Sequence, residues 1–533
     1  MGIKAKMSIL LVVFTASLFL LTYRLGYHPL WDDEALVALA AKGILESGDT
    51  SVYIDHNIVA YRGGILIRDG HDRSTPPLAS FIAAAAMAVL GGEAWALRLP
   101  FALLGWMTVA LLFLWLWRED APPIVWFMAA VAVLGNVSLS LFLRQCRYYS
   151  PVLFFSVASA YLYYAAPRDW GRVVLLSLSL AILFAANYLN YFALAICLGA
   201  DYFLWGRKTH SFRNPQIVFL VLSQVAVSLA VLSVWNPLAT GSAAALKSSG
   251  LLDKLTLLWL NIHDMSECEF VPFLFLLLAP VAYVLKRDVA LLRGAVAFIL
   301  YLVAISLTSP QLSVSLRTLA DIRYLPPLIP LGIFLVVFSL NHIFSKKTWL
   351  VGLFSIGLFW TNVFYAGGPW YAGIRSTPVS YVMELFQPVE DPYKPTISWI
   401  NENVRRGQSI LVVPDFKIYP LMYHAPHAVY AWQLPKGSRD KYPTLPPIHF
   451  KRVSAPDFMI IFGPSVKEVQ KAWAVEGVGV GDFELVTVLP YYWQDLYRPE
   501  LFSHAFKPMA YNPHAWEEIY IFKRKGENYG KRK

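Results

Sequence analysis

The sequence predicts an α-helical protein that crosses a membrane many times and ends in a soluble α/β domain. Of its 533 residues, 57% are hydrophobic and only 15% are charged, with a mean hydropathy of +0.49, whereas a soluble globular chain has about 25% charged residues. Eleven stretches approach the length of about 20 apolar residues that a helix needs to span the hydrocarbon. Residues 367–533, by contrast, hold 20 of the 45 Lys and Arg and 16 of the 35 Asp and Glu, as a soluble domain does.

The expected spans make residues 1–366 one transmembrane module of about 11 helices. They lie near 7–23, 99–117, 124–143, 151–165, 173–187, 190–205, 217–236, 271–285, 291–307, 326–344 and 349–366. The first resembles a signal peptide, with Lys4 and Lys6 before an apolar run, but no small-residue cleavage site follows it. We therefore expect a retained anchor.

The short basic loops predict the orientation of these spans, because Lys and Arg in short loops stay on the cytoplasmic side. The cytoplasmic set comprises Lys4, Lys6, Arg118, Arg168, Arg172, Arg207, Lys208, Arg213, Lys286, Arg287, Arg293, Lys346 and Lys347. The alternation then places 24–98, 144–150, 237–270, 308–325 and the C-terminal domain outside. We expect a multi-pass protein of the cytoplasmic (inner) membrane, with its polar residues facing the periplasm or the outside.

One apolar stretch, 78–91, would reverse this alternation if it crossed the membrane. It has only 14 residues, is rich in Ala and follows Thr75-Pro76-Pro77. That length favours an interfacial or re-entrant helix. We therefore expect 24–98 to form one long outer loop, although a twelfth span remains the alternative.

The C-terminal domain, 367–533, alternates short β-type runs with helical segments. The expected strands are 409–413, 458–462, 485–489 and 518–522, and the expected helices are 396–405 and 465–475. This alternation is typical of a small α/β domain.

Several classes of function are disfavoured. The net charge of +10 is scattered among apolar runs, so no nucleic-acid partner is expected. Almost nothing within the spans ionises, which argues against an ion channel or a proton-coupled pump. No Walker A, HExxH, GxSxG or strand-borne GxGxxG motif is present.

Arginines occur on the expected outer side, where the positive-inside rule disfavours them. They are Arg62, Arg68, Arg73, Arg98, Arg144, Arg147, Arg317 and Arg323. A guanidinium binds phosphate through two parallel hydrogen bonds, so as a group they indicate an anion site. Individually, each could instead reach lipid headgroups or pair with a nearby carboxylate.

An acidic run, Trp31-Asp32-Asp33-Glu34, follows the first span on the same side. Adjacent carboxylates at a membrane surface are expected to raise the pKa of at least one of them, and such a group can act as a general base. The alternative is a solvated acidic start of a helix.

These pieces resemble, in order, the lipid-linked-sugar membrane glycosyltransferases of the GT-C fold. The branch includes protein O-mannosyltransferases, the aminoarabinose transferase acting on lipid A, and galacturonosyltransferase-like enzymes. The matching pieces are Asp33-Glu34-Ala35, Thr75-Pro76-Pro77-Leu78, Trp95-Ala96-Leu97-Arg98-Leu99-Pro100, Arg144-Gln145-Cys146-Arg147-Tyr148-Tyr149-Ser150 and Arg323-Tyr324-Leu325-Pro326. Thr75 replaces the family's His and Gln145 its Glu, so roles attached to those two positions do not carry over.

The resemblance implies an inverting transfer of a sugar from a polyprenyl-phosphate donor to a glycan, lipid or protein acceptor outside the cytoplasm. Asp33, with Glu34, would be catalytic and take the acceptor's proton. Arg98, Arg147 and Arg323 would bind the donor phosphate and stabilise its growing charge.

Two further features are left open by the sequence. No cofactor is required, but a divalent metal is possible, with oxygen ligands from Asp32, Asp33, Asp69 and Asp72. In the tail, four aromatic and charged residues form either a possible acceptor-binding cluster or a structural ion pair with packed aromatics: Trp493, Asp495, Arg498 and His504.

Two alternative functions also remain. A lipid or polysaccharide transporter would need a polar path through the bilayer. An enzyme like the O-antigen ligases would use a polyprenyl diphosphate donor, with arginines but no essential acidic pair.

Overall fold

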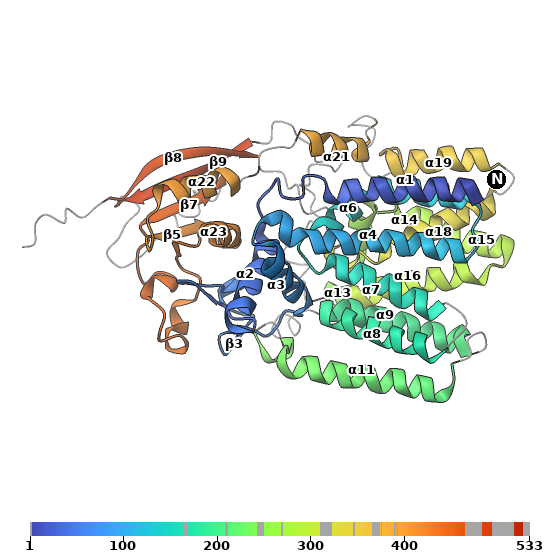
Figure 1. Ribbon diagram of the computed structural model, residues 1–533, viewed down its shortest axis with the longest axis horizontal. Coiled ribbons are helices and arrows are strands. Elements are labelled where there is room, and N and C mark those ends of the chain that lie inside the picture. Colours follow the sequence, from blue (N-terminus) through green and yellow to red (C-terminus); the bar gives the residue numbers. More distant parts are fainter. Residues whose placement is uncertain are drawn as a thin grey trace, which may run out of the picture.

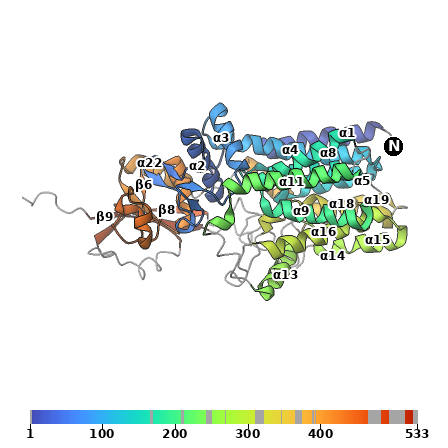
Figure 2. The same ribbon diagram turned by 90° about the horizontal axis from the view of Figure 1, so that it is seen from below.

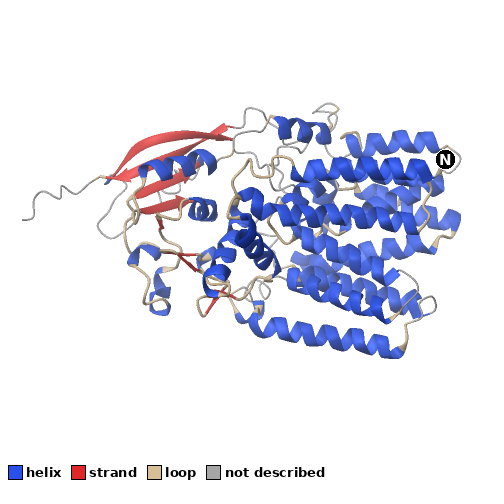
Figure 3. Ribbon diagram, viewed as in Figure 1, coloured by secondary structure: helices blue, strands red, loops and turns tan. Residues whose placement is uncertain are grey.

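A computed structural model shows a long helix bundle with a small sheet domain at one end (Figures 1 and 3). It describes residues 3–164, 169–207, 212–241, 250–267, 270–309, 322–344, 347–364, 374, 376–387, 391, 393–463, 482–492 and 516–525. The N-terminus lies at the opposite end of the bundle from the sheet. We call these two ends the N-terminal end and the domain end.

Each of the eleven predicted apolar stretches contains a helix. The bundle comprises α1 (Ile3–Thr22), α4 (Ala94–Arg118), α5 (Pro123–Gly135), α6 (Val137–Arg144), α7 (Tyr149–Tyr164), α8 (Trp170–Ala186), α9 (Tyr188–Asp201), α11 (Asn214–Val234), α14 (Phe273–Leu276), α15 (Leu278–Lys286), α16 (Val289–Thr308), α18 (Leu328–Ile343) and α19 (Thr348–Trp360). Among the described residues, five helices are long and apolar enough to cross a membrane, or six if α5 and α6 count as one bent span. The chain is a multi-pass membrane protein.

The break between α5 and α6 turns the chain by 62°. Asn136 occupies the break, where its side chain accepts a hydrogen bond from the Leu139 amide at 2.7 Å and caps α6. Asn136 also donates to the Phe270 carbonyl at 3.3 Å. These bonds fix the direction of α6 and so the position of the segment that follows it, which carries Arg147.

Two further helices lie at the domain end, between the bundle and the sheet (Figures 1 and 2). They are α2 (Asp32–Ser47) and α3 (Leu78–Leu90), joined through two small hairpins, β1 (Tyr53–Ile54) with β2 (Asn57–Ile58) and β3 (Ile67–Arg68) with β4 (His71–Asp72). The helix predicted over 78–91 is thus present as α3 and packs against α2 and the start of the bundle at the domain end.

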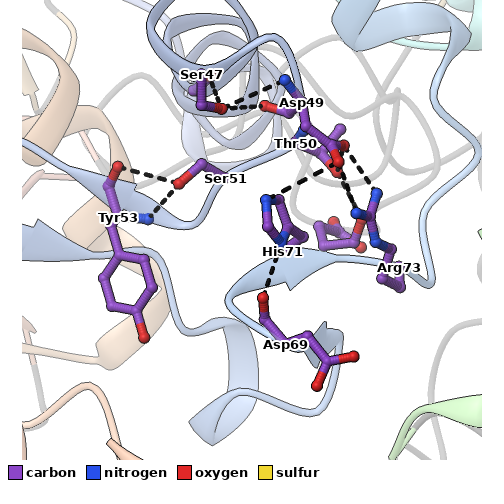
Figure 4. A network of polar contacts seen from close by, with 10 residues as sticks. Ser47, Asp49, Thr50, Ser51, Tyr53, Asp69, His71 and Arg73 are labelled. Atoms are coloured by element: carbon purple, nitrogen blue, oxygen red, sulfur yellow. Dashed lines mark hydrogen bonds and ion pairs between the residues drawn. The ribbon is translucent and has the colours of Figure 1, made fainter.

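An ion pair ties the second hairpin to the end of α2 (Figure 4). Arg73 donates to both oxygens of Asp49, at 2.8 and 2.6 Å, and these bonds lower the pKa of Asp49 to about 2. Arg73, one of the arginines from which an anion site was predicted, therefore already binds a carboxylate of the protein itself.

The sheet domain has five strands in the order β6-β5-β7-β9-β8. They are β5 (Ser409–Val413), β6 (Val429–Tyr430), β7 (Phe458–Phe462), β8 (Phe483–Tyr492) and β9 (Trp516–Arg524). The first three are parallel, whereas β9 pairs antiparallel with β7 and β8. The four predicted strands are confirmed, and the helix predicted over 396–405 overlaps α22 (Tyr393–Asn403); the one predicted over 465–475 lies outside the described residues.

The sheet domain shares its hydrophobic core with the first loop. Ala35 and Leu39 of α2 belong to the same buried cluster as Ile410, Ile460 and residues of α23 (Ile418–His424). Asn57 extends the contact, because its side chain bonds to the Ala428 carbonyl and the Tyr430 amide at 2.9 and 2.7 Å. By contrast, α21 (Thr377–Phe386) packs against the bundle. The sheet domain is therefore fixed directly to the helix that begins with the acidic run.

Candidate functional site

The acidic run forms the first turn of α2, at the domain end of the bundle. Asp32, Asp33 and Glu34 start the helix, where the helix dipole favours negative charge. Successive residues of a helix point about 100° apart, so the three carboxylates face different partners instead of one another. Each carboxylate therefore has to be considered separately.

Glu34 forms a buried ion pair with Arg98. The Glu34 side chain is fully buried and that of Arg98 is 7% exposed. Arg98 donates from Nε and Nη2 to the two carboxylate oxygens at 2.9 and 2.5 Å. Glu34 also accepts from the Cys146 amide at 2.7 Å. The pair therefore ties α2 to α4 and to the chain after α6.

The remaining donors of Arg98 bind backbone carbonyls. Nη1 donates to Leu25 and His28 at 2.9 and 2.8 Å, and Nη2 donates to Pro29 at 2.9 Å. A guanidinium has five N–H groups, and all five are now used within the protein. In this arrangement Arg98 has no donor for the phosphate it was expected to bind, and Glu34 has no exposed oxygen with which to take a proton from an acceptor.

Asp33 faces the other two arginines of the predicted site. Arg147 Nη1 lies 2.5 Å and Arg323 Nη1 lies 3.2 Å from Asp33 Oδ2. The Asp33 side chain is 18% exposed, unlike that of Glu34. Both contacts use Oδ2, and Oδ1 forms no hydrogen bond with the described residues. The structure thus brings together three residues of which Asp33 and Arg323 are 290 positions apart in the sequence.

Arg147 lies among aromatic rings and keeps a free donor. Its guanidinium is 5.9 Å from the Trp31 ring, 5.3 Å from that of Tyr148 and 5.5 Å from that of Tyr149. Its Nε is buried and has no hydrogen-bond partner within the described part of the chain. A buried donor without an acceptor is costly, so this N–H is suited to an acceptor that arrives with a ligand.

Arg323 is held by a short helical turn, η4 (Ile322–Tyr324). Tyr148 stacks on Tyr324, with ring centroids 6.2 Å apart and planes 13° apart, and its hydroxyl donates to the Arg323 carbonyl at 3.4 Å. The stacked Tyr148 and Tyr324 thus connect the segments that carry the two arginines of the site.

Asp32 connects the site to the sheet domain, a contact that the sequence analysis missed. Tyr393, at the start of α22, donates its hydroxyl hydrogen bond to Asp32, and Lys417 donates to Tyr393 at 3.1 Å. One position before α2's cap, the Leu30 amide donates to His424 Nε2 at 3.2 Å. Burial lowers the pKa of His424 to about 4, which keeps the imidazole neutral and able to accept. No local pattern marks such long-range partners.

The possible metal ligands are not gathered together. Among the residues that the structure describes, no group of three or more His, Cys, Asp or Glu side chains could hold a metal ion. Asp32 and Asp33 have the partners given above, and Asp72 accepts from Thr75 and Ser74. Within the described residues these carboxylates are therefore not gathered into one site, and the possible divalent metal stays a prediction from the sequence. The four tail residues predicted to bind an acceptor, Trp493, Asp495, Arg498 and His504, lie outside the described residues.

Comparison with solved structures identifies the fold. The structure of ArnT from Cupriavidus metallidurans bound to undecaprenyl phosphate matches over 97% of this chain and 97% of that chain, with a TM-score of 0.56 and 11% identity. The chain has the fold of ArnT. The apo state of ArnT matches over 88% of this chain and 94% of that chain, with a TM-score of 0.53 and 13% identity. No family model and no curated protein matches the sequence. The GT-C fold expected from the sequence resemblance is thereby confirmed.

Proposed function

We propose that this protein is an inverting glycosyltransferase that moves a sugar from a polyprenyl-phosphate donor to an acceptor outside the cytoplasm. The domain end of the bundle would then face the outside. Asp33 would be the base, and Arg147 and Arg323 would bind the donor phosphate. We assign Glu34 and Arg98 to holding the site together instead of to the chemistry, because their polar atoms are already engaged.

The observation that carries this proposal is the unsatisfied Nε of Arg147 beside a partly exposed carboxylate. A phosphate oxygen would supply the missing acceptor, and a charge-assisted bond of this kind is stronger than a neutral one. The ring faces of Trp31, Tyr148 and Tyr149 hold the guanidinium in place. The Arg147 guanidinium would then lie between the proposed base, at its Nη1, and the phosphate, at its Nε.

The proposed reaction is a single displacement at the anomeric carbon. The acceptor's nucleophilic atom forms a bond to that carbon while the bond to the phosphate oxygen breaks, and its electron pair leaves with the phosphate. Asp33 Oδ1 takes the acceptor's proton. Arg147 and Arg323 stabilise the charge that develops on the phosphate, an electrostatic contribution that requires no movement during the reaction.

The bundle provides apolar surface for the lipid part of such a donor. Long apolar helices run from the site toward the N-terminal end (Figure 1). The similar structure of ArnT is described as bound to undecaprenyl phosphate. A polyprenyl chain along this surface would leave its phosphate at the domain end, where the arginines lie.

The test is Asp33→Asn in purified protein supplied with a labelled polyprenyl-phosphate sugar. We expect loss of transfer with donor binding retained, because the amide keeps the shape but cannot take a proton. Asp55→Asn is the matched control: Asp55 is exposed in the turn between β1 and β2, and the same chemical change there should leave transfer unchanged. Normal transfer by Asp33→Asn would remove the assignment of the base.

The donor class needs a separate comparison. Wild-type protein should transfer from a polyprenyl monophosphate sugar and not from the diphosphate. Transfer from the diphosphate alone would instead support a ligase-like enzyme, and movement of intact lipid without transfer would support a transporter.

A further inference from the structure

A polar pocket lies at the domain end, apart from the Asp33 site. It is a cavity of about 70 Å³ between the end of α1, the end of α6 and α21. Its lining includes Arg24, His28, Arg144, Tyr381 and Glu384, with Glu34 and Arg98 also contributing to its wall. Asp33, Arg147 and Arg323 do not line it, so a ligand there would not occupy the proposed donor site.

The charges in this pocket do not cancel. Glu34 is paired with Arg98, and Glu384 lies 3.4 Å from His28 Nε2. Within the described ranges, neither Arg24 nor Arg144 forms an ion pair with a carboxylate. Two permanently charged guanidiniums therefore face a small cavity that holds one further carboxylate, that of Glu384, and the remaining excess of positive charge favours an anion.

Both arginines retain donors after their contacts with the protein are counted. Arg144 donates to the carbonyls of Leu20 and Tyr23 and to the Tyr381 hydroxyl, at 3.0, 2.8 and 2.7 Å. Arg24 donates to the Phe386 carbonyl at 3.1 Å. Since a guanidinium has five N–H groups, these bonds orient the two side chains and leave N–H groups for a ligand.

The pocket adjoins an apolar surface on the outside of the bundle. The rings of Phe19, Tyr23 and Phe386 pack together, with centroids 4.8 to 6.0 Å apart. On α21, Met383 and Phe386 are 59% and 53% exposed, whereas Tyr381 and Leu385 are buried. An amphipathic helix of this kind, at the end of a membrane-spanning bundle, is suited to the interface between headgroups and acyl chains.

We propose that this pocket binds the phosphate of an anionic phospholipid, with Arg24 and Arg144 donating to the phosphate oxygens. The acyl chains lie against the surface formed by Phe19, Met383 and Phe386. The two parts of the site match the two parts of such a lipid, and the bilayer around the bundle supplies it. Because Glu34 and Arg98 form part of the wall, the lipid also rests against the ion pair that holds the start of α2.

The test measures lipid retention by native mass spectrometry, with phosphatidylglycerol and phosphatidylcholine as probes. Wild-type protein should retain more phosphatidylglycerol than phosphatidylcholine. Arg24→Gln should weaken that retention by about tenfold, the effect of removing one charge-assisted hydrogen bond. Arg24 is exposed and makes one backbone bond, so folding should be unaffected. Arg68→Gln is the control, because it removes the same charge from β3, where the Arg68 side chain is 52% exposed.

A second variant tests the apolar part of the site. Met383→Glu places a negative charge on the exposed surface of α21 and should also reduce phosphatidylglycerol retention. Binding of polyprenyl phosphate should be unchanged in both variants, which separates this site from the proposed donor site. Equal retention of the two phospholipids, or wild-type retention by Arg24→Gln, would overturn the proposal. Displacement by inorganic phosphate as readily as by phosphatidylglycerol would overturn the lipid assignment and indicate a free-anion site.

Discussion

Glu34→Gln should lower mainly the stability and Asp33→Asn mainly the transfer rate, although the two carboxylates are neighbours in the chain. Glu34 is fully buried and accepts from Arg98 twice, from the Cys146 amide and from the Trp31 amide at 3.4 Å. In the Gln variant, the amide NH₂ group has to face one of these donors, and Arg98 keeps an uncompensated buried charge. Removing one partner of a buried ion pair costs about 3–5 kcal/mol, which is the expected loss of unfolding free energy.

Asp33 is 18% exposed, and its partner Arg323 is 29% exposed. Asn at this position still accepts a hydrogen bond, so the unfolding free energy should fall by less than about 2 kcal/mol. The transfer rate should fall by about 10²–10⁴-fold, the usual contribution of a positioned base. The two losses, in stability and in rate, should therefore occur in different variants.

The unfolding free energy of each variant is measured by reversible unfolding in mixed detergent micelles, with tryptophan fluorescence as the signal. The transfer rate of the same variant is measured without denaturant. Asp55→Asn again provides the exposed control. A Glu34→Gln protein as stable as wild type but unable to transfer sugar would refute the reasoning, because it would place the chemistry on the buried carboxylate.

Other parts of the structure give further expectations. Arg147→Lys should lower kcat by about 10²-fold or more, because a lysine has no N–H group at the position of the buried Nε. Steady-state kinetics at varied donor concentration measure this, and a change in KM alone would contradict it. Tyr393→Phe should lower the unfolding free energy by about 1–3 kcal/mol by leaving buried Asp32 without its hydroxyl donor; an unchanged unfolding curve would show that this contact is dispensable. The pKa of His424 is about 4 in the folded protein, below the ordinary histidine value of 6.5, so the unfolded chain binds this proton first as the pH falls. The stability present above pH 6.5 should therefore decrease as the pH falls toward 4 and change no further below it. His424→Gln should flatten that part of the pH profile of unfolding, and an unaltered slope would exclude His424 as its source. Asp49→Asn should lower the unfolding free energy by about 1 kcal/mol or less, because the Asp49 side chain that pairs with Arg73 is 34% exposed. A larger loss in the same unfolding titration would contradict this expectation.

The sequence was sufficient for the parts of the fold that depend on local patterns. Apolar stretches predicted the bundle helices, and short β-branched and aromatic runs predicted β5 and β7 at their observed bounds. The apolar stretch at 78–91 likewise predicted α3. The shared core between α2 and the sheet domain was not predictable, because contacts such as that of Asn57 with Tyr430 join residues 373 positions apart without a local signal.

The sequence predicted which residues belong to the candidate site, but not which of them are structural and which keep polar atoms for a ligand. The outer arginines and the acidic run were visible in the sequence, but it was the resemblance to the GT-C glycosyltransferases that joined Asp33, Arg147 and Arg323 in one hypothesis. The structure places these three together. The same reasoning treated Glu34 and Arg98 as equivalent to them. Only the burial of Glu34 and the five occupied donors of Arg98 separate a structural ion pair from a site with unused donors, and burial at this level depends on tertiary packing.

A structure of the protein with bound polyprenyl phosphate, determined by electron cryomicroscopy, tests the central claim most directly. The account predicts phosphate density within hydrogen-bonding distance of Arg147 Nε and of Arg323, beside Asp33, with Arg98 still bound to Glu34. Density for the polyprenyl phosphate itself at Arg98, in the pocket of Arg24 and Arg144, or elsewhere away from Asp33 would contradict it.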